Sequence, residues 1–420
     1  MANGFSKSDV VFFEDVLEGF EPNLSVSQHA EKFSPGMQEF VQSGLQIWRP
    51  MPYSSLEVTG LNITGMYADA TQLSVPSSLN TSTDVINVPR EMSAVELNDP
   101  LRRKGLVESA VLTLAGHAER KVADVAANQG SLVITKSTAL TGYDDVTPCE
   151  AIMSENDIAQ NKPKTMAFNI RDYNRMSGEL AGKNTMQGRP DTAYGRSLIG
   201  DNVAGFSAFK AQYAKTLAAA GGGAITVSGA QSHIPVATDA NGNNVDNRYG
   251  NLTVSATAGV AAGDAFTIAG VNAVSHLHKQ DTGQLKTFRV VEVVDGTTLK
   301  ITPQIIVNHG GATQPEKEYA NCSAQAANLA AITWLNTTQA KTNIFFANNS
   351  IELIGGSLAV DGDEFANMAV MREKTSNGIE IVFAKQGDIS TLKAKYRLTM
   401  WLNANLLNPE MAGILLGGQA

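Results

Sequence analysis

Apolar side chains recur at steps of three and four along residues 101–128, the longest helical pattern in the chain. Pro100 precedes the pattern and Gly130 follows it, which is the usual order of start and stop signals in a helix. At 1.5 Å a residue such a helix is roughly 42 Å long. A single stripe indicates a helix lying across a sheet, although a coiled-coil partner helix is an alternative. The stripe comprises Val107, Val111, Leu114, Ala118, Val122 and Val125.

The first 35 residues contain a second, shorter amphipathic pattern. Val10, Phe13 and Phe20 share one face, and acidic residues crowd the remainder. An isolated helix this short is marginal in water. The segment is therefore either an arm that docks on a neighbouring subunit or the first helix of an ordinary domain.

Other stretches alternate as strands do. Residues 56–73 predict a long β-hairpin with little core of its own. Short helices are expected near 172–180, 203–219 and 323–335. Further strands are expected at Val85–Val88, Leu132–Ile134, Ile344–Phe346, Ile379–Val382 and Leu398–Trp401.

The composition changes at Gly221–Gly223, and strands then follow one another to about Cys322. Five apolar pairs alternate with polar residues, and turn signals separate them. This predicts a small barrel or sandwich inserted into a mixed α/β fold, whose outer segments complete one domain across it. The pairs are Ile225/Val227, Leu252/Val254, Phe266/Ile268, Phe288/Val290 and Leu299/Ile301.

Composition narrows the function. The formal charge of −9 argues against a surface that wraps DNA. Two cysteines, Cys149 and Cys322, make no disulfide framework. No secretory signal pattern is present, and no apolar run approaches the ~20 residues of a membrane span, so no membrane partner is expected.

Catalytic motifs are weak. Residues 178–184 resemble a phosphate-binding loop with one residue too few between the glycines, and Asn184 stands where Ser or Thr would bind Mg²⁺. His276 and His278 suit a metal site only if a third ligand exists, and a solvent-exposed pair is the simpler interpretation. Residues 361–364 are better explained as a polar turn than as a Ca²⁺ loop. No enzyme activity, cofactor or metal is predicted.

Extended pieces that cannot bury their own apolar faces are typical of a shell-forming subunit. In several stretches, in the same order, the chain resembles the major coat protein of P22-like short-tailed bacteriophages. They span nearly the whole chain and include Glu119–Thr135 (ERKVADVAANQGSLVIT), Ile225–Ser232 (ITVSGAQS), Val245–Arg248 (VDNR), Val293–Thr297 (VVDGT), Ile301–Pro303, Tyr319–Asn321, Gln386–Leu392 (QGDISTL) and Pro409–Gln419.

The resemblance implies an α+β, HK97-type capsid fold with an inserted all-β barrel domain. It also implies a major capsid protein that assembles with a scaffolding protein into an icosahedral procapsid. Portal protein and packaged double-stranded DNA, bound without sequence specificity, are the other expected partners. The protein would be assembled in the host cytoplasm and reside in the virion. The implied parts are an N-terminal arm (1–35), a peripheral domain (36–130) with an extended loop (about 52–75) and spine helix (101–128), an axial domain (131–220 with 335–420) and the inserted domain (221–334).

Two sites carry over from the family. The acidic cluster that binds scaffolding protein falls on Glu14, Asp15 and Glu18. The loop that reaches a neighbouring capsomer falls on residues 239–248, with Asp239, Asp246 and Arg248 as its charged members. Asp246 could accept from a neighbour's cation or brace Arg248 within its own subunit, and a mobile hairpin without a partner is the alternative for the loop. A tail or decoration protein, or less plausibly a cytosolic enzyme with an accessory β-domain, is the alternative function.

Overall fold

The structure is a computed structural model in which contacts divide the chain into two compact units. Unit 1 comprises 1–47, 77–122 and 352–405, and unit 2 comprises 48–76, 123–351 and 406–420. The residues it describes are 5, 7–51, 57, 60–62, 64, 71–157, 162–182, 189–360, 368–388 and 390–419.

Unit 1 is built on a six-stranded sheet in the order β1-β17-β20-β19-β18, with β4 pairing β20. The register places Val88, Leu398 and Phe383 directly opposite one another on three neighbouring strands. All three are buried, so they form one apolar row on a single face. The strands predicted around residues 85, 380 and 400 are confirmed. The bounds are β1 Glu31–Phe33, β4 Val85–Ser93, β17 Ile351–Gly355, β18 Ala369–Lys374, β19 Glu380–Asp388 and β20 Lys393–Leu406.

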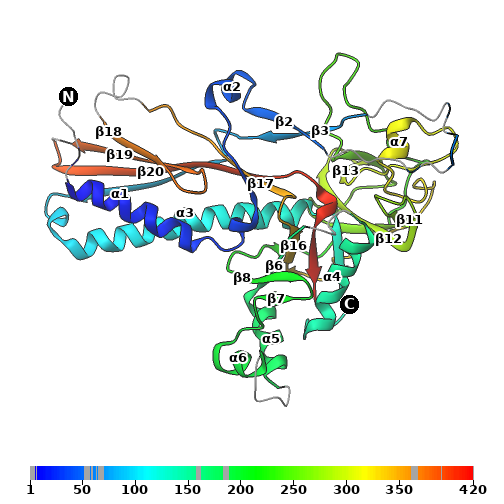
Figure 1. The fold of residues 1–420 in the computed structure, drawn as a ribbon, viewed down its shortest axis with the longest axis horizontal. Coiled ribbons are helices and arrows are strands. Elements are labelled where there is room, and N and C mark those ends of the chain that lie inside the picture. Colours follow the sequence, from blue (N-terminus) through cyan, green and yellow to red (C-terminus); the bar gives the residue numbers. More distant parts are fainter. Residues whose placement is uncertain are drawn as a thin grey trace. The chain divides into compact units, whose positions relative to one another are not determined.

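Two helices, α1 (Lys7–Phe20) and the first part of α3 (Pro100–Gln129), run alongside each other next to this sheet (Figure 1). At one point they touch closely, because a Cβ at Gly19 would lie 3.3 Å from Val111 Cγ2. A short helix, α2 (Met37–Gln42), belongs to the same unit.

The prediction of a long helix over 101–128 is confirmed by α3. Asp99 Oδ1 accepts a hydrogen bond from the Leu101 N–H at 3.0 Å, which caps the first turn. Val111, Leu114, Ala118 and Val122 of the predicted stripe are buried.

One charged residue of α3 is buried. Glu119, which lies mostly off the stripe, is 7% exposed. Its carboxylate accepts hydrogen bonds from the backbone N–H groups of Ser25 (2.8 Å), Val26 (3.0 Å) and Ser27 (3.0 Å). A buried carboxylate is stable when its oxygens are saturated in this way. Glu119 therefore fixes the turn at residues 25–27, which follows α1.

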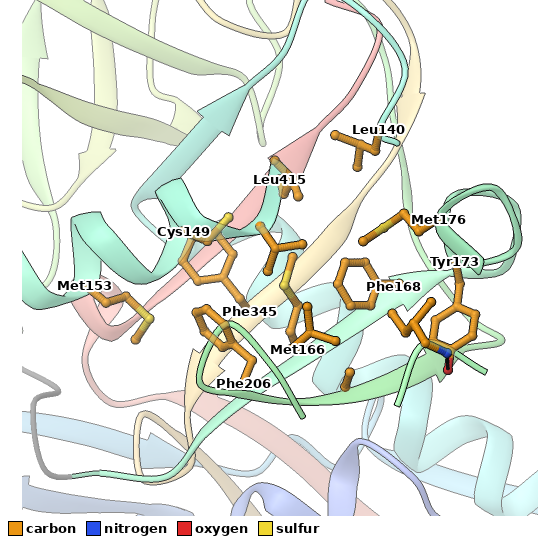
Figure 2. Packing of buried hydrophobic residues seen from close by; sticks show 14 of the residues in the cluster. Leu140, Cys149, Met153, Met166, Phe168, Tyr173, Met176, Phe206, Phe345 and Leu415 are labelled. Atoms are coloured by element: carbon orange, nitrogen blue, oxygen red, sulfur yellow. Dashed lines mark hydrogen bonds between the residues drawn. The ribbon is translucent and has the colours of Figure 1, made fainter. Parts of the chain in front are cut away.

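Unit 2 contains a mixed six-stranded sheet in the order β5-β21-β16-β6-β8-β7. Figure 2 shows its core, in which Phe345, Met166, Phe168 and Phe206 pack together beside Cys149. Helix α5 confirms the helix predicted near 172–180. The elements are β5 Leu132–Thr135, β6 Lys164–Asn169, β7 Asn202–Val203, β8 Phe206–Ala211, β16 Asn343–Ala347, β21 Ala412–Leu416, α4 Tyr143–Glu155, α5 Ile170–Ala181 and α6 Arg189–Arg196.

Unit 2 also contains the inserted β-module, an antiparallel sheet in the order β10-β13-β12-β11-β14. Bridges Thr226↔Ala331 and Val227↔Val254 link the two edges of this sheet and close it into a barrel. All five predicted apolar pairs lie in its core. The elements are β10 Gly250–Thr253, β11 Ala265–Val274, β12 Asp281–Val293, β13 Thr298–Thr302, β14 Ile332–Trp334 and the short helix α7 Gln314–Glu318.

The glycine run that precedes the barrel has a packing role. A Cβ at Gly222 would lie 2.7 Å from Cζ2 of the Trp334 ring, which is closer than side-chain atoms approach one another. Glycine is thus required there by the neighbouring ring, and the run marks a close approach of backbone to side chain.

The remaining elements include β2 (Gln46–Pro50), which pairs with β3 (Ser74–Ser78). They flank the predicted extended loop, of which the structure describes 57, 60–62, 64 and 71–75; the rest of that prediction lies outside the described residues, as do 361–364 and Asn184. The other short elements are β9 Thr216–Leu217, β15 Ala340–Lys341, η1 Glu21–Asn23, η2 Ser27–His29, η3 Glu96–Asn98 and η4 Pro409–Met411.

Two predicted helices are wrong. Residues 203–219 form strands, and β8 pairs in parallel with β6 so that Phe206 and Ala208 face the core. Residues 323–335 end in strand β14 and contain Leu329 at a φ of 65°, which no α-helix accommodates. Both stretches are rich in alanine, and pairing with a neighbouring strand outweighs their helical propensity.

The C-terminal end of α3 is held by the barrel through Arg289 of β12. This side chain is fully buried, and its guanidinium donates to the carbonyl oxygens of Ala127, Gly130 (3.5 Å) and Gly263 (2.7 Å). Burial lowers the pKa of Arg289 to about 9, so the group remains charged at neutral pH. A cation at a helix C-terminus satisfies unpaired carbonyls and opposes the helix dipole.

The spine helix yields a first prediction. Leu114→Ala removes a side chain with 0% exposure and should lower the free energy of unfolding by about 2–4 kcal/mol, because it leaves a cavity. The urea midpoint of purified subunits measures this loss. Leu112→Ala on the same helix is the matched control, since Leu112 is 57% exposed, and it should cost less than about 0.5 kcal/mol. Equal midpoints for the two variants would contradict the assignment of Leu114 to the core.

A second prediction concerns pH. Burial, together with Lys121 and Arg120, lowers the pKa of His117 to about 4. The unfolded chain therefore binds a proton below its pKa of 6.5 that the folded chain refuses, so stability should fall as pH drops from 6.5 towards 4. For a fully buried imidazole the loss of unfolding free energy would be about 3 kcal/mol. Solvent screening reduces the expected loss to about 1–2 kcal/mol.

Urea midpoints measured between pH 7.5 and 4.5 test this dependence. His117→Gln should flatten the acid side of the profile, whereas His278→Gln, at an exposed position, should leave it unchanged. A profile that His117→Gln does not alter would show that other groups govern the acid sensitivity.

Candidate assembly surfaces

Three acidic residues share the outer face of α1. Glu14, Asp15 and Glu18 are all exposed and lie three and four residues apart, so they are neighbours on the helix surface. No hydrogen bond or ion pair joins them to the part of the chain that the structure describes. We call these residues the acidic face.

The opposite face of α1 is anchored. Phe13, Val16 and Phe20 are buried, and the Phe13 ring stacks on Phe383 with centroids 6.0 Å apart. Because this face is apolar and packed, the helix has a fixed orientation that directs the acidic face outward.

Not every acidic residue of the arm is available. Asp9 is 3% exposed and its Oδ2 lies 2.7 Å from Lys385 Nζ. Glu21 Oε1 accepts from Ser376 Oγ at 2.6 Å. These two carboxylates join the arm to the rest of unit 1, whereas the acidic face is directed to solvent.

The loop of residues 238–249 is an ordered hairpin. Asp239 Oδ1 accepts hydrogen bonds from the Asn241 and Asn243 N–H groups at 2.8 and 2.9 Å. The bonds to Asn243 foremost lower the pKa of Asp239 below its ordinary value. Residues 239–244 form the tip of the loop and are all exposed. Within this tip the Asp239 carboxylate stabilises the turn.

Arg248 lies elsewhere than expected. A guanidinium that pairs with a neighbouring subunit would have to face solvent. The Arg248 side chain is instead 8% exposed, and its Nη2 lies 2.7 Å from Asp246 Oδ2. The guanidinium also donates to the carbonyl oxygens of Leu406 (2.5 Å) and Pro76 (3.4 Å). Asp246 therefore braces Arg248 within its own chain, which is the second of the two roles considered for it. The Asp246–Arg248 pair, which we call the clamp, attaches the base of the loop to β3 at Pro76 and to the last residue of β20, Leu406.

A second buried charge cluster was not predicted from the sequence, and it corrects the interpretation of His276 as one of a solvent-exposed pair, since that side chain is 21% exposed. Glu410 Oε1 pairs with Lys286 Nζ, and Oε2 lies 3.0 Å from His276 Nε2. Burial by itself raises the pKa of Glu410, but the charges and hydrogen bonds of His276 and Lys286 outweigh it and hold the pKa well below the usual range. The cluster ties the C-terminal segment to the barrel. Only the tertiary fold joins residues so far apart in sequence.

Metal-binding and nucleophilic side chains in the described residues are further candidates for a site. In the described ranges no group of three or more His, Cys, Asp and Glu side chains is arranged to hold a metal ion. Both cysteines are free and buried, and burial raises the pKa of both thiols, that of Cys322 to about 12, so neither is a ready nucleophile.

Among the helices in the described part of the chain, none is both long and apolar enough to cross a membrane.

Comparison with known families decides the identity. The family described as P22 coat protein, gene protein 5, matches residues 1–418. The chain belongs to the P22 coat protein family. It is a major capsid protein of a tailed bacteriophage, and family membership together with the spine helix and inserted barrel places it in the HK97-type capsid fold.

Several solved structures are similar to this P22-type coat protein. The CUS-3 coat protein I-domain is 49% identical, covering 27% of this chain and 96% of that one, with a TM-score of 0.24. The capsid of the cyanophage P-SCSP1u is 11% identical over 93% of this chain and 87% of that one, with a TM-score of 0.43. The Mycobacterium phage Che8 structure is 8% identical over 93% and 90%, with a TM-score of 0.42.

The clamp yields a third prediction. Arg248→Met leaves the Asp246 carboxylate partly buried without its cation and should destabilise the coat subunit by about 3 kcal/mol. Melting of unassembled subunits measures this directly. Asp239→Asn keeps an acceptor oxygen at an exposed position and should change stability by less than about 0.5 kcal/mol.

The same Arg248→Met protein should also give shells with reduced heat tolerance, because the subunit itself is weaker. If its subunits melt as the natural protein does while only its shells become fragile, Arg248 serves a neighbour in the shell and the internal clamp is secondary.

Proposed function

We propose that this coat protein assembles with a scaffolding protein into a closed icosahedral procapsid, which later expands around packaged double-stranded DNA. The acidic face of α1 is the observation that carries the scaffolding part of this proposal. It holds three exposed carboxylates on a helix whose other face is anchored. A rigid cluster of like charge is suited to recruit a basic partner.

The energetics favour recruitment over fold stability as the role of these residues. Exposed charges contribute little to stability. Their neighbours Asp9 and Glu21, by contrast, form internal contacts with Lys385 and Ser376. Changes to Glu14, Asp15 and Glu18 should therefore affect partner binding and leave folding intact.

We propose that the loop tip, residues 239–244, contacts a neighbouring capsomer. The tip is exposed, and the Asp246–Arg248 clamp gives it a defined base from which to project. The second carboxylate oxygen of Asp239, Oδ2, accepts a hydrogen bond from the Asn243 side-chain amide at 3.2 Å. A cation of a neighbouring subunit would share this oxygen with Asn243. An exposed pair is worth about 0–1 kcal/mol, and repetition over a shell multiplies that value.

We also propose a division into an N-terminal arm (1–35), a peripheral domain (36–130), an axial domain (expected at 131–220 with 335–420) and an inserted domain (221–334). The barrel's separate apolar core supports the last of these. Residues 352–405 lie in unit 1, where β20 pairs with β4, so we propose that they belong with the peripheral segment and not with the axial domain. The net charge of −9 suits a shell that encloses DNA without sequence-specific contacts. Assembly in the host cytoplasm, around a portal protein, completes the proposal.

A fourth prediction tests the acidic face. Coat protein with Glu14→Lys/Glu18→Lys, co-expressed with the scaffolding protein of the same phage, should give particles with at most about a tenth of the normal scaffolding content, because two attractive charges become repulsive. Densitometry of purified particles measures the ratio of the two proteins.

The matched control is Glu155→Lys/Glu373→Lys, which makes the same change in net charge on exposed residues of α4 and β18. Subunit melting should be unaffected in both double variants. Normal scaffolding content in the Glu14→Lys/Glu18→Lys particles would remove the acidic face from the proposal.

A further inference from the structure

Two asparagine–glycine pairs lie in turns that the structure describes, Asn241–Gly242 in the loop tip and Asn377–Gly378 between β18 and β19. A third pair, Asn3–Gly4, lies outside the described residues. An asparagine followed by glycine is chemically labile, because glycine has no side chain that shields its backbone nitrogen from the preceding side-chain amide. The surroundings of each pair decide whether that nitrogen and that amide can meet in the folded protein.

The surroundings of Asn241–Gly242 are open. Both residues are exposed, and among the described residues no hydrogen bond holds the Asn241 side-chain amide. A Cβ placed on Gly242 would meet no atom within 4 Å, so no neighbouring group crowds the pair. The Gly242 N–H donates to the Asp239 carbonyl oxygen at 3.0 Å. A single exposed hydrogen bond contributes little net free energy, so this bond opens readily and leaves the nitrogen accessible.

The second pair is held in place. Asn377 is half-buried, its Oδ1 accepts a hydrogen bond from Lys32 Nζ, and its backbone N–H donates to Glu21 Oε1 at 3.3 Å. The Gly378 N–H donates to the Thr375 carbonyl oxygen at 2.9 Å. Hydrogen bonds to charged groups are stronger than neutral ones. The Asn377 side chain must therefore leave the Lys32 ammonium before its amide carbon can reach the Gly378 nitrogen.

We propose that Asn241, and not Asn377, is a site of spontaneous deamidation in the folded coat protein. The Gly242 nitrogen gives its proton to water or hydroxide and attacks Asn241 Cγ, which forms a new C–N bond. The bond from Cγ to Nδ2 breaks, and the amino group takes up a proton and leaves as ammonia. Water then opens the resulting cyclic imide at either carbonyl carbon, so that residue 241 becomes aspartate or isoaspartate. Water is the only other reactant, and nothing is oxidised or reduced.

The modification changes the charge and the backbone of the loop tip. A carboxylate at position 241 lies two residues from Asp239, whose Oδ1 accepts the Asn241 N–H at 2.8 Å, so two like charges share one turn. Isoaspartate also adds a methylene group to the backbone of that turn. The modification itself is independent of assembly, whereas its effect on a shell rests on the proposed contact between the tip and a neighbouring capsomer.

The experiment ages purified full-length coat subunits in mildly alkaline buffer made with isotopically labelled water. Peptide mass spectrometry then locates each new carboxylate, and the label distinguishes reaction during ageing from reaction during digestion. Deamidation at Asn241 should be at least about tenfold faster than at Asn377, because the bond to Lys32 must open before Asn377 reacts. In urea the two rates should become similar, since both turns are then unfolded and both residues precede glycine.

Two variants of the tip accompany this measurement. Asn241→Gln keeps an exposed amide but would have to close a larger ring, so the product at this position should disappear. Asn244→Gln is the matched control, because it makes the same change at another exposed residue of the tip, and it should leave the rate at Asn241 unaltered.

The outcomes separate this inference from the proposed capsomer contact. Unmodified Asn241 in aged folded subunits overturns the inference, and so does an Asn377 that reacts as fast as Asn241 while folded. Slower reaction of Asn241 in assembled shells than in free subunits supports both the deamidation site and the contact. Equal rates in shells and subunits support the site and contradict the contact.

Discussion

The buried guanidinium of Arg289 is the contact on which the join between the spine helix and the inserted barrel depends. It occupies the C-terminus of α3, where unpaired carbonyls and the helix dipole both call for a cation. Its removal would leave the Ala127 and Gly263 oxygens buried and unpaired, at a cost of several kcal/mol. Gly130 allows the chain to turn directly into β5, because a Cβ there would lie 2.9 Å from the Gly413 backbone nitrogen. A long rigid helix can therefore end inside the protein without a penalty.

The same chemical group serves two opposite purposes in this coat protein. Buried carboxylates, such as Glu119 and Glu410, are saturated with hydrogen bonds or cations and hold distant segments together. Exposed carboxylates on α1 have no such internal contacts and are directed to solvent. Burial decides between these purposes, because a carboxylate withdrawn from water must find partners inside the protein, whereas one in water need not.

Sequence periodicity performed well where an element packs on one side only. The stripe of α3 and the alternating pairs of the barrel were both located correctly, since a half-buried element displays its own period. It failed at 203–219 and 323–335. There, short alanine-rich stretches carry no strong period, and pairing partners distant in sequence decide their conformation. The burial of Glu119 was not foreseen, and Arg248 was placed among the residues that reach a neighbour, for the same reason: charge in a sequence signals exposure unless a partner is known.

The sequence by itself determined the helical spine, the strand-rich insertion, the acidic arm and, through ordered family-like stretches, a capsid subunit. These depend on local period and on residue order, both of which are visible in one dimension. Only the tertiary structure decided which charges are internal: Arg289 at the end of α3, Arg248 clamped by Asp246, and Glu410 between Lys286 and His276. The physical reason is that desolvation is a property of three-dimensional surroundings, and residues from segments up to 162 positions apart supply those surroundings.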